Sequence, residues 1–232
     1  MAFALPSLVR VRWQKQHRII ATRYPPIPLF ERAGLNAHQL RALHALQART
    51  NPRLMQAAGT LHLVRDEDIV TGPNASIVMA AFTHIGFPSR FTDGSYGVYY
   101  GSRTLETAIR ETAYHRERDA HERQLKPQEF EMRAYTGKVV KPMYELRVTK
   151  YAKLLHGDDY SASQQFARQV IAVDPDAWGM VFHSARHPGG ESIAAFRPPA
   201  LSLPVTGPLL SYQWNGERIT TVFEKQGPLL FL

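Results

Sequence analysis

Strand patterns and one long helix pattern alternate in the middle of this chain, and this alternation restricts the possible folds more than any other feature. Residues 97–101 (GVYYG) are rich in strand-forming side chains and are bounded by glycine. Thr104 can cap a helix over residues 105–122, in which apolar and small side chains recur at helical spacing. A chain that carries both periodicities packs helices against a sheet. We therefore predict an α+β fold with a mixed sheet core and flanking helices.

Prolines, caps and turn residues place further elements on either side of this centre. The Pro-rich run 23–28 predicts an extended lead-in, because its three prolines lack backbone donors. Asn215-Gly216 predicts a hairpin of strands 209–214 and 217–223. The other predicted elements are helices over 37–48 (capped by Asn36), from Pro52 to before Gly59, over about 74–84 and over 162–173 (capped by Ser161), and strands over 61–64, 129–135, 138–148, 179–184 and 192–196.

Several classes of protein and site are excluded by what the sequence lacks. It has no cysteine, which excludes disulfides, thiolate nucleophiles and cysteine-based metal sites. His183 and His187 are four residues apart, but Pro188 follows and breaks any helical pair of ligands, so we predict no metal site. Residues 69–89 have the length of a membrane span, but glycines and prolines interrupt them. With no convincing export signal, we expect a soluble, cytoplasmic protein that does not bind membranes.

The net charge of +8 comes from the N-terminal part of the chain. Residues 1–65 contain ten Lys or Arg side chains and one acidic residue, Glu31, whereas the rest of the chain is nearly neutral. This asymmetry predicts a surface that meets a polyanion or an acidic partner, and the alternative is a solvated basic surface that binds nothing. We divide the chain into a basic, helical N-terminal extension packed on the core, residues 1–60, and a core domain, residues 61–232.

Three residues at nearly regular spacing form the candidate site. Arg90 follows a Pro-Ser pair, Tyr100 ends the glycine-bounded strand, and Glu111 lies on the next helix. Glu111 flanks the buried stripe of that helix, so its carboxylate is partly desolvated and needs a cationic or hydroxyl partner. Taken singly, each has an ordinary alternative: Arg90 caps a helix end or pairs with Asp93 on the surface, and Tyr100 fills the core. Glu111 is then an ordinary helix carboxylate that pairs with neighbours of Arg110 or with His115.

The joint pattern resembles the RES domain, the toxin half of RES–Xre type II toxin–antitoxin modules. The family's motif pairs an Arg and a strand Tyr with a Glu in a Thr-Ala-x-x-Glu helix, here residues 107–111. The family's Ser corresponds to Ser184 in the segment WGMVFHSAR (178–186), and residues 195–198 (AFRP) resemble the family's ending. The resemblance covers roughly residues 60–232.

The resemblance implies an ADP-ribosyltransferase-like fold and an enzyme that degrades NAD, which is its substrate; no separate cofactor is expected. Breaking the nicotinamide–ribose bond develops positive charge at the ribose carbon, and Glu111 would stabilise that charge. Arg90 would hold the pyrophosphate and Tyr100 would face the nicotinamide. Ser184 would orient either the substrate amide or Glu111.

Two other functions and one partner remain to be weighed. Transfer of ADP-ribose to a protein uses the same fold, whereas a non-enzymatic nucleic-acid-binding module would use the basic N-terminus instead. The resemblance also implies a helix-turn-helix antitoxin of the Xre type that blocks the site. That partner would bind the operon's DNA, so the toxin would meet DNA only indirectly.

Overall fold

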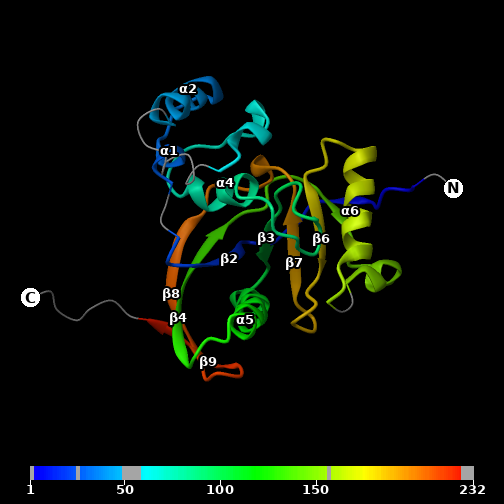
Figure 1. Ribbon diagram of the computed structural model, residues 1–232. Helices are drawn as coiled ribbons and strands as arrows, with labels where there is room; N and C mark the ends of the chain where they lie inside the picture. The colour runs from blue at the N-terminus through cyan, green and yellow to red at the C-terminus, as the bar shows by residue number, and fades with distance from the viewer. Residues whose placement is uncertain (1–2, 25–26, 49–58, 156–157, 226–232) are drawn as a thin grey trace, which may run out of the picture.

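The computed structural model describes residues 3–24, 27–48, 59–155 and 158–225. Its centre is a nine-stranded mixed sheet with the order β1-β5-β6-β7-β3-β2-β4-β8-β9 (Figure 1). The strands are β1 (Leu8–Val9), β2 (Gln16–Ala21), β3 (Tyr99–Ser102), β4 (Gln128–Gly137), β5 (Met143–Glu145), β6 (Gly179–His183), β7 (Glu191–Ala195), β8 (Val205–Trp214) and β9 (Ile219–Lys225). Within this described sheet only β5 and β6 run parallel, and every other pair is antiparallel.

Helices cover the sheet, and two of them lie on opposite sides of its central strands. In Figure 1, α4 lies above and α5 below the level of β2 and β3, and α6 stands beside β6. The α-helices are α1 (Pro28–Glu31), α2 (Ala37–Ala48), α4 (Ala75–Thr83), α5 (Leu105–Glu122) and α6 (Ser161–Val173), and the 3-10 turns are η1 (Leu61–Leu63), η2 (Asp66–Asp68), η3 (Thr149–Leu155) and η4 (Pro198–Ala200). The predicted α+β fold is confirmed.

The unit formed by β3 and α5 matches the sequence prediction closely. Thr104 Oγ1 accepts a hydrogen bond from the Thr107 backbone N–H at 3.1 Å, which is the predicted N-cap. The apolar stripe of α5, which includes Leu105, Ala108 and Ile109, packs on β2, β4 and β8. Since α5 follows β3 after two residues, the helix that carries Glu111 is fixed against the centre of the sheet.

Other predicted helices are confirmed, although their caps partly differ from those expected. Asn36 Oδ1 accepts from the Gln39 backbone N–H at 2.9 Å, as predicted for α2. Ser161 is the first helical residue of α6 rather than its cap, and its N–H is bound by Asp159. At α4 the carboxylate of Glu31 accepts from the Asn74 and Ser76 backbone N–H groups, so a distant acid supplies the cap. The helix predicted from Pro52 lies outside the described residues.

Some of the strand predictions are confirmed, one is wrong, and one strand is shorter than predicted. The strands at 179–184 and 192–196 and the Asn215-Gly216 hairpin are confirmed as β6, β7 and the β8–β9 pair. The strand predicted at 61–64 is wrong, because Leu61–Leu63 form a 3-10 turn. The strand predicted at 138–148 reduces to β5, while β4 continues through Thr136-Gly137, where a turn was expected.

The N-terminal segment contributes more to the sheet than its description as a helical extension implies. It carries α1 and α2, but it also supplies β2, which pairs with β3 on one side and with β4 on the other. A boundary at residue 60 therefore assigns an interior strand of the sheet to the extension. Among the described residues, the model contains no helix long and apolar enough to cross a membrane.

We predict that Gly101→Ala destabilises the protein at the junction of β2 and β3. A Cβ atom at residue 101 would lie 2.2 Å from Oε1 of Gln16, a fully buried side chain whose Nε2 donates to the Tyr99 hydroxyl at 2.8 Å. Overpacking of this kind costs about 1–3 kcal/mol of unfolding free energy, which urea denaturation measures. The double variant Gln16→Ala/Gly101→Ala should lose less than the sum of the two single changes; simple additivity would contradict the steric cause.

Candidate active site

Glu111 and Ser184 are brought into direct contact. Ser184 follows β6 and donates its hydroxyl proton to Glu111 Oε1, at an oxygen–oxygen distance of 2.5 Å. The Ser184 oxygen also accepts the backbone N–H groups of Arg186, at 3.2 Å, and His187, at 3.0 Å. Since a hydroxyl has two lone pairs and one proton, these two bonds leave its proton for the carboxylate. In the pairing of Ser184 with Glu111 that the sequence suggested, Ser184 is therefore the donor and Glu111 the acceptor.

A second link fastens the Ser184 loop to the start of α5. The ring Nδ1 of His187 lies 2.9 Å from Thr107 Oγ1, and that hydroxyl lies 2.8 Å from Thr104 Oγ1. The backbone at Gly190 approaches the same threonine so closely that a Cβ there would lie 2.9 Å from it. Because Thr107 precedes Glu111 by one helical turn, the Ser184 loop and the helix that carries Glu111 are held together at two places.

Arg90 lies in a tight turn that Tyr100 holds in place. Ser89 and Thr92 pair across this turn, and the Tyr100 hydroxyl accepts from the Phe91 backbone N–H at 3.0 Å and contacts Ser89 Oγ at 2.8 Å. Burial raises the pKa of Tyr100 to about 12, so the phenol stays neutral at ordinary pH. Tyr100 therefore positions the turn through its hydroxyl.

The guanidinium of Arg90 is largely buried under an aromatic ring. Arg90 is 8% exposed, and its guanidinium carbon lies 4.7 Å from the centre of the Tyr160 ring. Asp93, the alternative surface partner, forms its ion pair with Arg168 instead, at 2.7 Å.

His115 connects the Arg90 side of the site with the Glu111 side. Burial lowers the pKa of His115, Glu111 opposes that change, and the cations Arg186, Arg118 and Arg90 add to it. His115 therefore lies within electrostatic reach of both Glu111 and Arg90, so these two predicted residues belong to one place in the fold.

Sequence reasoning missed an aromatic and cationic rim around this place. Arg186 stacks on the Tyr114 ring, with its guanidinium carbon 3.5 Å from the ring centre, and forms an ion pair with Asp158. His115 could have been found, since it lies one helical turn after Glu111, whereas no local pattern marks Tyr160. The described residues contain no group of three or more His, Asp or Glu side chains that could hold a metal ion.

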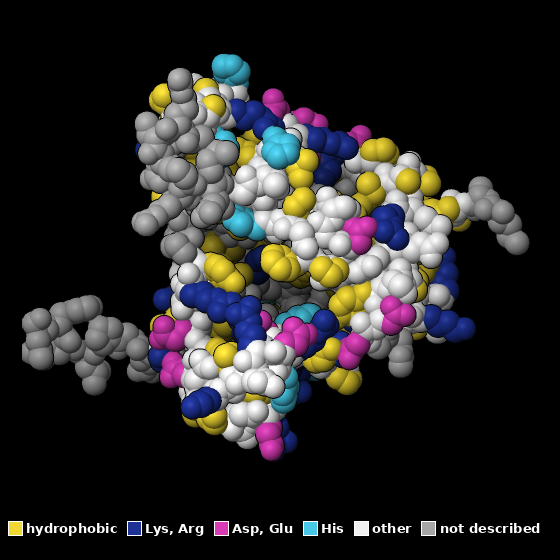
Figure 2. Space-filling view, viewed as in Figure 1, with side chains coloured by type: hydrophobic (Ala, Val, Ile, Leu, Met, Phe, Trp, Pro, Cys, Tyr) yellow, Lys and Arg dark blue, Asp and Glu magenta, His cyan; other side chains and the backbone are white. Residues whose placement is uncertain are grey.

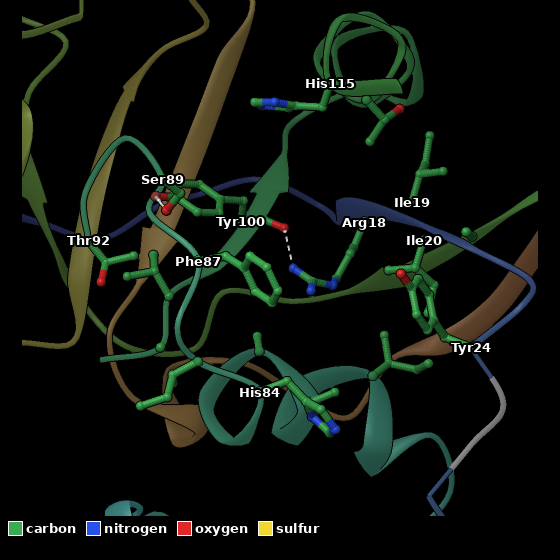
Figure 3. Close-up of a pocket in the computed structure, with 18 of the residues that line it drawn as sticks. Arg18, Ile19, Ile20, Tyr24, His84, Phe87, Ser89, Thr92, Tyr100 and His115 are labelled. Carbon is green, nitrogen blue, oxygen red and sulfur yellow. Dashed lines mark hydrogen bonds between the residues drawn. The ribbon is translucent and has the colours of Figure 1, made fainter. Parts of the chain in front are cut away.

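A cavity of about 690 Å³ adjoins the site between α4 and α5. Tyr100, His115 and Arg18 from β2 are among the residues that line it, and His115 is the one within electrostatic reach of Glu111. Figure 3 shows Arg18 between Tyr100 and Phe87 on one side and Tyr24 on the other. Figure 2 shows this face of the molecule hollowed near its centre, with hydrophobic, basic and some acidic side chains around the opening. Sequence analysis counted Arg18 only as part of the basic N-terminus.

Comparisons with known proteins place this chain among relatives of little sequence identity. An uncharacterized protein, y4oC of Sinorhizobium fredii (strain NBRC 101917 / NGR234), is 25% identical over 209 residues, which cover 89% of this chain and 86% of the relative. A chain in the crystal structure of the M. tuberculosis MbcT–MbcA toxin–antitoxin complex aligns with a TM-score of 0.43 and 10% identity, covering 91% of this chain and 87% of its own length. A likeness at that level carries no inference about function.

A match to a family model is more decisive. The model described as the RES domain matches residues 65–215, a range that contains Arg90, Tyr100, Glu111 and Ser184. The match spans well over half of the sequence. Because it does so, this chain belongs to the RES domain family.

Proposed function

We propose that this protein is an enzyme that cleaves the nicotinamide–ribose bond of NAD, and that it acts as the toxin of a type II toxin–antitoxin pair. The observation that carries this proposal is the contact between Ser184 and Glu111, in a chain of the RES domain family. The motif residues are distant in sequence, yet Tyr100 holds the turn that carries Arg90, and His115 lies within electrostatic reach of both Arg90 and Glu111.

The reaction needs one group above all, a carboxylate beside the ribose. As the bond breaks, nicotinamide leaves with the electron pair and the ribose carbon becomes cationic. Glu111 stabilises that cation, while Ser184 holds the carboxylate through Oε1. Water then adds to the ribose carbon and releases one proton, which gives ADP-ribose and nicotinamide. If inorganic phosphate adds in its place, ADP-ribose 1″-phosphate is formed.

Arg90 and Tyr100 bind and orient the substrate in this proposal. The guanidinium of Arg90 offers paired donors to a phosphate of the dinucleotide. Tyr100 holds the turn that carries Arg90 and borders the cavity, so that its ring can pack against the nicotinamide. An enzyme that consumes NAD must be silenced in its own cell, and we propose a helix-turn-helix antitoxin of the Xre type as the silencing partner.

The structure weakens the case for a nucleic-acid-binding arm. Two N-terminal cations already have carboxylate partners within the protein: Arg41 pairs with Asp66, and Arg65 pairs with Asp176. Cations used in this way are not available as a free basic surface for phosphates. We therefore place any contact with DNA on the antitoxin.

The test is chromatography of NAD incubated with the purified full-length protein, with and without phosphate. We expect nicotinamide to appear together with ADP-ribose, or with ADP-ribose 1″-phosphate when phosphate is the acceptor. Radiolabelled NAD that leaves its label on protein would instead identify ADP-ribosyl transfer. If folded protein, free of any inhibitor, leaves NAD intact over hours, the proposed function is wrong.

A further inference from the structure

The cavity between α4 and α5 has basic groups in its wall and no acidic ones. Its described lining contains Arg18, His84, His115 and Arg116, but neither Asp nor Glu. Arg116 is partly neutralised by Asp119, whose Oδ2 lies 3.7 Å from its Nη1. None of the ion pairs among the described residues includes Arg18, whose charge is therefore left for a ligand.

Arg18 enters the cavity because β2 and β3 separate there. Within the described sheet these strands are paired at His17 and Ser102, and the Arg18 side chain fills the opening beyond that point. Its Nη1 donates to the Tyr100 carbonyl oxygen at 3.1 Å, and its guanidinium lies 4.3 Å from the centre of the Tyr99 ring. Its Nε is buried and has no hydrogen-bond partner among the described residues. A desolvated guanidinium with an unused donor favours an anion.

The other walls of the cavity suit a flat, mostly apolar group. They include aliphatic side chains of α4, β2 and β4, such as Ile77, Ile20 and Met132. At the mouth, the aromatic side chains of Phe87 and Tyr24 are 83% and 56% exposed. An aromatic ring held in water gains from a planar partner that covers it. The ligand class that satisfies both features is a planar base joined to a phosphate.

We propose that this cavity holds the adenylate half of the dinucleotide, with the base against Phe87 and Tyr24 and the adenosine-side phosphate at Arg18. The inference rests on the proposed function. It adds the orientation of the substrate, with the nicotinamide end at Glu111 and the adenine end in the cavity. His115 lines the cavity and lies within electrostatic reach of Glu111, and Tyr100 lines it beside Arg90. A dinucleotide with its scissile bond at Glu111 therefore extends past His115 into the cavity. Arg90 then meets the phosphate on the nicotinamide side.

The experiment measures binding of AMP and of nicotinamide mononucleotide to the full-length protein by calorimetry, beside the KM for NAD. Phe87→Ala should weaken AMP binding about 5-fold or more and raise the KM, while leaving nicotinamide mononucleotide unaffected. Phe87 is so exposed that this change cannot unfold the chain. The matched control is Phe223→Ala, which removes an exposed ring on β9, the last strand in the sheet order, outside the lining of the cavity.

A second variant tests the phosphate contact. Arg18→Met should weaken AMP about 10- to 100-fold and Arg18→Lys by less, whereas Arg12→Met, an exposed arginine of the same segment, should change nothing. Thermal melting separates loss of binding from loss of fold.

The outcomes distinguish the cavity assignment from the reaction. The cavity assignment is overturned and the proposed function stands if NAD is cleaved but AMP does not bind. The same holds if NAD is cleaved and AMP binds the Phe87→Ala variant as tightly as it binds the wild-type protein. If Phe87→Ala weakens nicotinamide mononucleotide instead, the proposed direction is wrong. If AMP binding depends on Phe87 and Arg18 but NAD stays intact, the cavity assignment stands and the proposed function fails.

Discussion

Replacing Glu111 with glutamine should lower the rate of nicotinamide release from NAD by roughly 10²- to 10⁴-fold. Glutamine has the same shape, and its amide oxygen can still accept the Ser184 hydroxyl, which now lies 2.5 Å from Glu111 Oε1. The fold and the loop contact are therefore kept, but the negative charge that stabilises the ribose cation is lost. Single-turnover measurement of nicotinamide, beside a thermal melt, separates chemistry from folding.

The matched control for this change is Glu122→Gln on the same helix. Glu122 is exposed and pairs with Arg118 at 3.0 Å, four residues earlier, an interaction of little energetic weight. The control should keep the rate within about 2-fold. Ser184→Ala should fall between the two variants, because the carboxylate remains but loses the donor that orients it. A Glu111→Gln protein that keeps more than about a tenth of the wild-type rate would rule out the assigned role of the charge.

The parts of the fold that sequence predicted are those that local chemistry determines. A glycine-bounded strand, a threonine cap and an apolar stripe all lie within residues 97–122, and together they define β3 and α5. The Asn215-Gly216 turn is equally local: the Asn215 side chain accepts the Glu217 and Arg218 backbone N–H groups and closes the hairpin. Such elements need no knowledge of what packs against them.

The central strand β2 could not be predicted in the same way. Its first three residues, Gln16, His17 and Arg18, are polar, which hides an interior strand in a sequence analysis that looks for apolar alternation. Its partners β3 and β4 lie about 80 to 120 residues further along the chain, so its place depends on long-range pairing. Inside the sheet, Gln16 Nε2 donates to the Tyr99 hydroxyl, while Gln16 Oε1 has no hydrogen-bond partner among the described residues.

The same division applies to the candidate site. The positions of Arg90, Tyr100 and Glu111 followed from a spaced motif and a family resemblance. The contacts of Tyr160 with Arg90 and of His187 with Thr107 arise only when loops distant in sequence meet, so no local pattern marks them. Arg18 was counted as surface charge, because a strand's burial cannot be inferred from its cations.

Removing one partner of a buried ion pair should destabilise the protein more than any other single change considered. Asp68 is 4% exposed, and both its carboxylate oxygens accept from Arg197: Nε lies 2.9 Å from Oδ2, and Nη2 lies 2.8 Å from Oδ1. Arg197 also lies over the Trp178 ring, with its guanidinium carbon 4.3 Å from the ring centre. The pair joins η2 to the segment that leaves β7, two regions 129 residues apart in sequence.

We expect Asp68→Ala to reduce the free energy of unfolding by about 3–5 kcal/mol, since Arg197 stays charged and loses its main counter-ion. In a chain of this length that corresponds to a fall in Tm of roughly 6–20 °C, measured by calorimetry.

Asp66→Ala is the matched control, because Asp66 lies two residues earlier and pairs with Arg41 at 2.6 Å on the surface. It should cost no more than about 1 kcal/mol. The double variant Asp68→Ala/Arg197→Met should recover part of the loss, because the guanidinium that keeps only the exposed Asp176 as a partner, at 3.0 Å, is then removed from the interior. Equal effects of Asp66→Ala and Asp68→Ala would show that burial adds nothing to this ion pair, contrary to the reason given for the difference.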